Sequence, residues 1–221
     1  MAVMKNILRE MHHYMKENGF SLRNRCFFHI ENNLAYCVEL EMPSGLIYVN
    51  CYIIPLYIPT EFRYYTYGIR LRDVLSISNI GTAEINRWCN QLKVDLQRSV
   101  FPVFEKAKTP HSFVNLVNKG LFKDNCHISK VDIYRLRVFT ASYYNDAISV
   151  SQLCEEYEKI LSVTTYLTDG AKKKLVKEIQ ELRDNLSGSP QENEAYTMGI
   201  IKKVKQGCFG WKKTGDGLRE P

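Results

Sequence analysis

The stretch from Cys26 to Ile58, CFFHIENNLAYCVELEMPSGLIYVNCYIIPLYI, decides the fold. It contains three short apolar runs, separated by Asn32-Asn33 and by residues 43–45 (PSG). Each run is rich in aromatic or β-branched residues and is bounded by turn residues, which is typical of an antiparallel β-meander. In the third run both alternating sets of residues are largely apolar, so we expect this strand to be covered on both faces.

Helical periodicity flanks the predicted meander on both sides. Apolar residues at helical spacing, followed by Gly19 as a C-cap, predict an amphipathic helix over residues 3–18. A long helix is predicted over residues 82–108, with Pro102 inside its apolar stripe. Because proline has no N–H to offer the carbonyl of Arg98, we expect the helix to kink or end near this point.

Capping signals divide the rest of the chain into helices. The predicted helix starts are Thr109-Pro110, Ser129, Ser149, Asp169 and Ser189-Pro190. Apolar residues at helical spacing follow each of these starts. The second half of the chain is therefore predicted to be an array of antiparallel helices.

The predicted fold class is α+β. An antiparallel β-meander of three to five strands is covered by the N-terminal helix and the long Pro-kinked helix, and a C-terminal helical bundle follows. We expect a sheet domain over residues 1–108, a helical extension packed on it over residues 109–207, and a flexible tail over residues 208–221.

Composition indicates an ordinary globular protein of a reducing compartment. Of the 221 residues, 45% are hydrophobic and 24% charged, with a net charge of +6. The seven cysteines are odd in number, form no C-x-x-C pair and fall mostly in apolar runs, which favours buried, reduced thiols in a cytoplasm. No stretch approaches the roughly 20 apolar residues of a membrane span.

The sequence carries no recognisable catalytic or cofactor motif. Phosphate-binding glycine loops, a nucleophile elbow and zinc-ligand spacing are all absent, and Cys126-His127 is an isolated pair. Glu39 and Glu41 share one side of a predicted strand, where their carboxyls could stand about 7 Å apart, as in an inverting hydrolase. A solvated strand face is the simpler interpretation. We therefore expect no catalytic residues, no metal and no cofactor, and an enzyme is not favoured.

A tyrosine and arginine cluster is the candidate partner surface. Residues 61–71, EFRYYTYGIRL, are predicted to form a fourth strand, and such side chains are enriched at binding surfaces. An edge strand with amphipathic side chains is the alternative. The candidate partner-binding residues are Tyr57, Phe62, Arg63, Tyr64, Tyr65 and Tyr67.

Lysines accumulate late in the chain and give a candidate basic patch. From residue 169 onward the chain has eleven basic and eight acidic residues, a net charge of +3. Such a patch could contact a nucleic-acid backbone in a salt-sensitive manner, although solvated helix faces are the default interpretation. The candidate residues are Lys172, Lys173, Lys174, Lys202, Lys203 and Lys205.

Three motifs lie within roughly residues 3–120: a helix that ends in Gly19-Phe20, a third strand reading IYVNCYIIP (residues 47–55), and a turn at Arg70-Leu71. In these motifs the first half of the chain resembles a bacterial family of unknown function, family 4304. No activity is established for this family, so the resemblance implies a bacterial origin but no catalytic residues.

These observations favour a non-enzymatic binding or accessory protein of a bacterial cytoplasm. Its partner is expected to be another protein, not a membrane, and nucleic acid is not the favoured partner. Two alternatives stay open: an immunity-type protein that neutralises a toxin, and a binder of nucleic-acid backbones through the late lysines.

Overall fold

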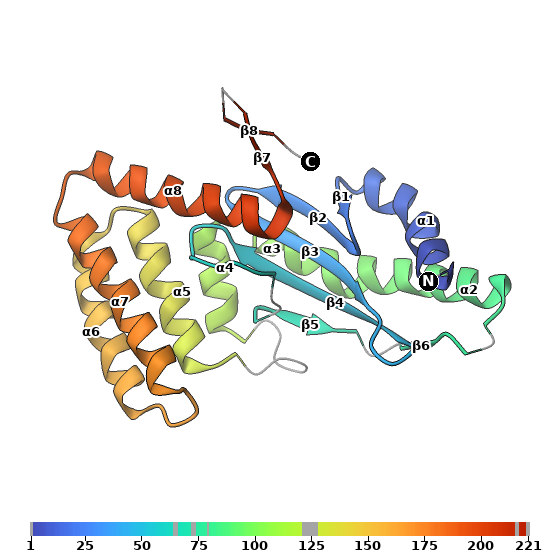
Figure 1. The fold of residues 1–221 in the computed structure, drawn as a ribbon, viewed down its shortest axis with the longest axis horizontal. Coiled ribbons are helices and arrows are strands. Elements are labelled where there is room, and N and C mark those ends of the chain that lie inside the picture. Colours follow the sequence, from blue (N-terminus) through green and yellow to red (C-terminus); the bar gives the residue numbers. More distant parts are fainter. Residues whose placement is uncertain are drawn as a thin grey trace. The chain divides into compact units, whose positions relative to one another are not determined.

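The protein has the predicted α+β fold and divides into two compact units. The computed structural model describes residues 2–63, 66–71, 74–78, 80–120, 128–214 and 217–219 (Figure 1). Unit 1 comprises residues 1–55 and 63–126, and unit 2 comprises residues 56–62 and 127–221. This division differs from the predicted boundary at residue 108, because the chain enters unit 2 at residue 56, returns at residue 63 and stays in unit 1 past residue 108.

Unit 1 contains one antiparallel sheet built around the predicted meander. Its strands follow the order β1-β2-β3-β4-β5, and β6 pairs with β4. Among the described residues of the predicted strand over 61–71, Gly68–Arg70 pair with β4 as β5, and residues 61 and 62 belong to unit 2. The strands are β1 (Ser21–Arg23), β2 (Cys26–Glu31), β3 (Leu34–Glu41), β4 (Leu46–Pro55), β5 (Gly68–Arg70) and β6 (Leu75–Ser76).

Turn residues fix the register of the meander. Asn32 and Asn33 have φ angles of 49° and 61°, which is the left-handed backbone that a two-residue hairpin turn requires. The register then places His29 opposite Tyr36 on one face of the sheet, and Cys37 opposite Tyr52 on the other. The expectation that β4 is covered on both faces is confirmed, because its residues from Val49 to Pro55 are all buried.

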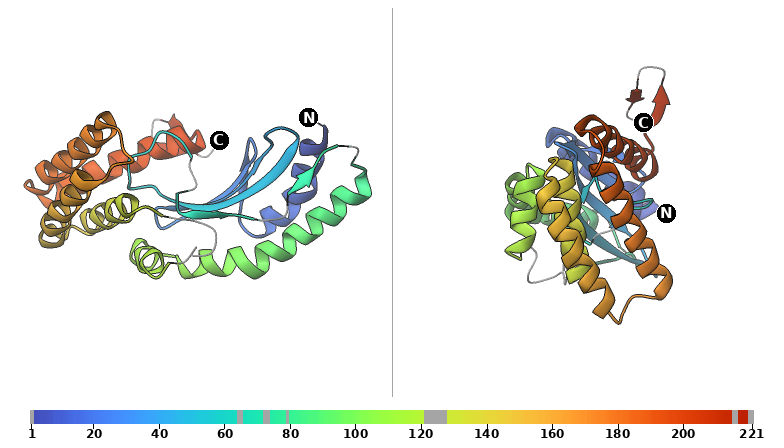
Figure 2. Two further views of the ribbon diagram at one scale, coloured as in Figure 1. Left: turned by 90° about the horizontal axis from the view of Figure 1, so that it is seen from below. Right: turned by 90° about the vertical axis from the view of Figure 1, so that its left-hand side faces the viewer.

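Two helical segments cover the sheet of unit 1, as predicted. Helix α1 (Ala2–Glu17) buries four apolar side chains and packs on α2 (Thr82–Asp95), where the Tyr14 hydroxyl donates to the Lys93 carbonyl at 3.1 Å. Helix α2 continues through η1 (Leu96–Val100) into α3 (Phe101–Lys106), and Figure 2 shows this continuous helix curving along one face of the sheet. Helix α4 (Pro110–Asn118) follows, capped by Thr109 as predicted.

Pro102 reshapes the long helix but does not end it. Segment η1 is a turn of π-helix, in which the Phe101 N–H donates to the carbonyl of Leu96, five residues back. A π-turn adds one residue to the helix and accommodates a proline that cannot join the regular hydrogen-bond ladder. The predicted disturbance at Pro102 is therefore a π-turn within a continuous helix.

Unit 2 is a helical array that begins at the predicted capping signals with small shifts. Ser129 and Ser189 cap their helices as predicted. Asp146, not Ser149, caps the second helix by accepting the Ser149 N–H at 3.1 Å, and Thr168, not Asp169, caps the third. The helices are α5 (Lys130–Tyr143), α6 (Ala147–Val163), α7 (Asp169–Leu186) and α8 (Pro190–Phe209).

The predicted tail begins later than expected. Cys208 and Phe209 are buried in the last turn of α8, and Gly210 ends the helix in a left-handed conformation with φ of 64°. Strands β7 (Lys212–Thr214) and β8 (Gly217–Arg219) then pair as a short hairpin. Among the described residues, no helix combines the length and apolar character that crossing a membrane would require.

Gly68 offers a direct test of the sheet. A Cβ added there would lie 2.4 Å from the Cys51 carbonyl oxygen and 2.4 Å from the Tyr52 Cβ. We expect Gly68→Ala to lower the free energy of unfolding by about 2 kcal/mol, because β4 must move to admit the methyl group. The midpoint of urea-induced unfolding, followed by circular dichroism, measures this loss.

Gly199→Ala is the matched control, because no atom lies within 4 Å of the added Cβ in helix α8. This variant should gain about 0.5 kcal/mol from its better helix propensity. Equal unfolding midpoints for Gly68→Ala and the unmodified protein would show that β5 does not approach β4 as closely as described.

Candidate functional site

The predicted tyrosine and arginine surface is not assembled by the structure. Tyr57 and Tyr67 are only 1% and 2% exposed. Tyr57 hydrogen-bonds Thr140 at 3.0 Å in unit 2, whereas Tyr67 packs edge-on against Phe113 in unit 1. Both tyrosines are thus core residues of different units, and their assignment to a partner surface was wrong.

The other members of that cluster differ in exposure and in their partners. Phe62 is 75% exposed, and Arg63 is largely buried in an ion pair with Glu39. Tyr64 and Tyr65 lie outside the described residues. Phe62 is therefore the one predicted residue that is seen to present a large apolar side chain to solvent.

The late lysines form two groups, not one patch. Lys172–Lys174 lie in the first turns of α7 and Lys202–Lys205 in the last turns of α8. Both groups lie away from the turn that joins the two helices, and because the helices diverge from that turn (Figure 1), the groups lie at the separate free ends of the pair. Lys205 is also engaged, with its ammonium 4.4 Å from the centre of the Trp211 ring.

The paired carboxylates of β3 are part of two separate ion pairs. Glu39 accepts hydrogen bonds from the Tyr52 hydroxyl at 2.6 Å and from Arg63 at 3.0 Å. Glu41 accepts from Arg70 at 3.0 Å. Burial is the largest cause that raises the pKa of Tyr52, and the nearby thiols and Glu39 raise it further. The hydroxyl therefore keeps its proton and donates it in the hydrogen bond to Glu39. Both carboxylates are thus engaged in ion pairs, and both line a hollow of about 510 Å³ beside Arg25 and Arg63.

The cysteines are buried thiols in the part of the chain that the structure describes. Burial raises the pKa of Cys89 to about 11 and that of Cys51 further above its usual range. Since the thiolate is the reactive form, these cysteines are poor nucleophiles. Cys126-His127 lies outside the described residues, and within the described ranges no cluster of three metal-ligating side chains occurs. The six buried thiols are Cys26, Cys37, Cys51, Cys89, Cys154 and Cys208.

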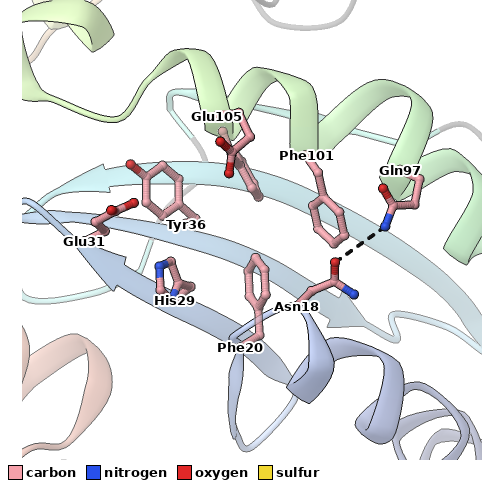
Figure 3. A pocket seen from close by; sticks show the side chains of 9 residues that line it. Asn18, Phe20, His29, Glu31, Tyr36, Gln97, Phe101 and Glu105 are labelled. Carbon is pink, nitrogen blue, oxygen red and sulfur yellow. Dashed lines mark hydrogen bonds between the residues drawn. The ribbon is translucent and has the colours of Figure 1, made fainter.

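A pocket in unit 1 is lined by aromatic rings and carboxylates and is the best candidate for a functional site. It has a volume of about 260 Å³ and lies between the sheet and the long curved helix. Figure 3 shows the labelled rings arranged around one space, with the two carboxylates at its sides. We call it the aromatic pocket, and its lining residues are Asn18, Phe20, His29, Glu31, Tyr36, Gln97, Phe101, Phe104 and Glu105.

Backbone geometry positions the sheet side of the aromatic pocket. His29 and Glu31 share one face of β2 because strand side chains alternate, and the register sets Tyr36 of β3 directly opposite His29. Phe20 enters from the end of α1, where Gly19 is left-handed (φ of 83°) and the Phe20 N–H donates to the Met15 carbonyl at 2.9 Å.

The π-turn forms the opposite wall. Gln97 lies within η1, Phe101 directly follows it, and Glu105 is one turn further along α3. The amide of Gln97 donates to the Asn18 side-chain oxygen at 3.5 Å and so connects this wall to the end of α1 (Figure 3). A π-turn at such a position is of interest because π-turns occur frequently at functional sites.

Four rings of the pocket form a closed set of neighbours. The centroid distances are 5.9 Å from Phe20 to His29, 6.0 Å from His29 to Tyr36, 5.2 Å from Tyr36 to Phe104, and 6.4 Å from Phe104 to Phe20. Phe101 extends the set by stacking on Phe20 at 5.6 Å. These are the separations of interacting aromatic pairs, so the walls of the pocket are mutually supported.

Most polar atoms of the aromatic pocket have partners in the protein. The Tyr36 hydroxyl donates to the Ala107 carbonyl at 3.3 Å, and His29 Nδ1 lies 3.0 Å from the Gly19 carbonyl, which requires a hydrogen on Nδ1. Burial, followed by the charges of Glu31 and Glu105, raises the pKa of Tyr36 above its ordinary value. The negative potential of the two carboxylates therefore reaches the pocket.

The two carboxylates differ in their own partners. Glu105 forms an ion pair with Lys108 at 2.6 Å, whereas no ion pair of Glu31 is recorded within the described residues. Counting Lys108, the charged groups at the pocket give a net charge of −1. The aromatic pocket thus combines apolar ring faces with a negative rim.

The sequence did not single out this pocket. His29 was interpreted as an ordinary core or surface histidine, and the helix residues that face it are about 70 positions away in the chain. The strand register, which pairs His29 with Tyr36, was the one local signal that could have placed two of its rings together.

Comparison with protein-family models, with curated proteins and with solved structures found no match. The resemblance to family 4304 therefore stays a prediction. The interpretation of the aromatic pocket rests on its own geometry.

The structural role of Glu39 can be tested through its hydrogen-bond donor. Tyr52→Phe removes a buried hydroxyl that donates to a carboxylate, and we expect the free energy of unfolding to fall by about 1–2 kcal/mol. Tyr48→Phe is the matched control on the same face of β4, since the Tyr48 ring contacts Arg70 while its hydroxyl has no recorded hydrogen bond to a described residue. Equal stability of the two variants in urea unfolding would contradict the role assigned to Glu39.

Proposed function

We propose that this protein is a non-enzymatic binding protein that captures a positively charged group in the aromatic pocket. The observation that carries the proposal is the closed set of Phe20, His29, Tyr36 and Phe104 next to two carboxylates. Aromatic ring faces carry negative electrostatic potential, and a cation within about 6 Å of a ring centre is attracted to it.

The charges at the pocket favour a cation over an anion. Glu31 and Glu105 both raise the pKa of Tyr36, which means that each acts on the pocket interior as a negative charge. Lys108 offsets part of this potential through its pair with Glu105. An anion placed among the rings would meet both ring faces and carboxylates of unfavourable sign.

The preference for binding over catalysis rests on the ring set and the negative rim. The Tyr36 hydroxyl and His29 Nδ1 are engaged by backbone carbonyls, and Asn18 and Gln97 bond each other. The hydrogen on Nδ1 leaves Nε2 as the second nitrogen of His29, so these bonds fix the orientation of the side chains and do not by themselves decide between binding and catalysis.

We also place the protein in a bacterial cytoplasm. The six free thiols support a reducing compartment, and the bacterial origin rests on the resemblance noted in the sequence. A protein partner and the immunity-type alternative stay predictions. The separation of the two lysine groups weighs against the nucleic-acid alternative, because backbone binding relies on a continuous basic surface.

Titration with small ions tests the proposed function. We expect at least one of methylammonium, guanidinium and tetramethylammonium to shift the ring NMR signals of Phe20, Tyr36 and Phe101 saturably, while acetate does not. Failure of all three cations, or equal binding of acetate, would contradict the proposal.

Two carboxamide substitutions test the electrostatic contribution of the carboxylates to cation binding. Glu31→Gln together with Glu105→Gln should weaken cation binding about fivefold, since each partly exposed carboxylate contributes under about 1 kcal/mol. The control is the double variant Glu155→Gln with Glu156→Gln, which removes the same charge from the exposed face of α6 in unit 2. This variant should bind the cation as tightly as the unmodified protein does. Equal weakening of both variants would mean that only the net charge matters.

A further inference from the structure

The open hydrogen-bond acceptors of the aromatic pocket indicate what the bound cation carries. Resting on the proposed function, we infer that the ligand is an N–H-bearing cation that donates to the Glu31 carboxylate and to His29 Nε2. The inference depends on the hydrogen bond at the other nitrogen of His29, on the surroundings of Glu31, and on the exposure of the pocket residues.

His29 presents one acceptor atom to the pocket. Its Nδ1 lies 3.0 Å from the Gly19 carbonyl, so the hydrogen of the neutral ring is on Nδ1 and Nε2 carries a lone pair. Contacts with Phe20 and Tyr36, at centroid distances of 5.9 Å and 6.0 Å, hold the ring in place. No hydrogen bond from a described residue to Nε2 is recorded. This atom is therefore an acceptor in a fixed position.

Glu31 is the open carboxylate of the pocket. Its side chain is half buried, and no hydrogen bond or ion pair of the carboxylate with a described residue is recorded. The hydrogen bond of Lys108 to Glu105, followed by the charges of Glu105 and Glu31, raises the pKa of Lys108. The ion pair of Lys108 is with Glu105, at 2.6 Å, so Lys108 senses the charge of Glu31 and leaves its oxygens to a ligand.

Strand geometry brings the two acceptors together. His29 and Glu31 are two residues apart on one face of β2, so their Cα atoms are about 7 Å apart. Figure 3 shows both side chains on the sheet side of the pocket, across from Phe101 and Gln97 of the long helix. Two acceptors that share one ammonium stand about 5 Å apart, since each hydrogen bond spans about 2.9 Å. Side chains on neighbouring same-face positions can reach that separation.

The exposure of the pocket residues decides which atoms a ligand meets. Phe20, Tyr36 and Phe104 are at most 8% exposed, so these rings are walls that offer little surface to a ligand. The side chains of His29 and Glu31 are only half buried. On the sheet side, the lining that a ligand can reach is therefore polar.

Desolvation of these acceptors favours a cation with N–H groups. A ligand that enters the pocket displaces water from the carboxylate and from Nε2. An N–H-bearing cation replaces that water with charge-assisted hydrogen bonds, whereas a quaternary ammonium covers the same atoms with methyl groups and leaves them unpaired. The quaternary ammonium keeps the attraction of its charge to the carboxylates, so it should still bind, but more weakly.

NMR titration of the full chain tests the inference with matched cations. Methylammonium and methylguanidinium carry N–H groups, and tetramethylammonium carries none. At about pH 8, where an ordinary imidazole is neutral, we expect the tighter N–H-bearing cation to bind about tenfold more tightly than tetramethylammonium. That cation should also shift the nitrogen-15 signal of His29 Nε2 as an accepted hydrogen bond does, and tetramethylammonium should not. The tighter cation identifies the group as an ammonium or a guanidinium.

A substitution tests His29 Nε2 as an acceptor. His29→Phe keeps a ring at this wall and removes Nε2, and circular dichroism checks the fold. We expect the N–H-bearing cation to bind about threefold more weakly, and tetramethylammonium within about twofold of the unmodified protein. His111→Phe, at an exposed position of α4, is the matched control and should leave both affinities unchanged. Equal losses for the two cations in His29→Phe would contradict the acceptor role.

The outcomes separate this inference from the proposed function. The nitrogen-15 signal of the unmodified protein decides the role of Nε2 even where His29→Phe does not fold. If tetramethylammonium binds as tightly as the N–H-bearing cations, or if Nε2 does not respond to them, this inference fails and the proposed cation site stands. If no cation binds at all, both the inference and the proposed function fail.

Discussion

The pairing of β3 with β4 is the constraint on which the rest of unit 1 depends. Eight residue pairs from Leu34↔Pro55 to Glu41↔Tyr48 set which side chains share a face. A slip of one residue would exchange the two faces, because strand side chains alternate. The same register places Tyr36 toward the aromatic pocket and Tyr52 beside Glu39, so the two polar arrangements of the sheet are specified together.

The π-turn is the second feature that makes the pocket possible. A regular helix over residues 82–106 would meet the ring of Pro102 without a place for it in the hydrogen-bond ladder. The extra residue of η1 resolves this conflict and sets Gln97 and Phe101 at the wall that faces Phe20. The π-turn that accommodates the proline therefore also places Phe101 among the rings of the pocket. The aromatic contacts pack the unit and, in our proposal, also bind the ligand.

Local signals in the sequence predicted local structure well. Asn32-Asn33 and the 43–45 turn predicted the meander, and Ser129 and Ser189 the helix starts, because each depends on residues close in the chain. Tyr57 and Tyr67 were misassigned because their burial depends on distant partners, Thr140 and Phe113. The aromatic pocket was missed for the same reason, since no property of residues 20–36 reveals which helix will cover them.

The most direct test of the account is a crystal structure with a heavy analogue of one of the probe cations. Tetramethylarsonium has the shape and charge of tetramethylammonium, and its arsenic scatters anomalously. The account predicts an anomalous peak in the space bordered by Phe20, Tyr36 and Phe101, within about 6 Å of at least two ring centres. A structure in which the rings fill that space, or in which the arsenic binds only elsewhere, would contradict the central claim.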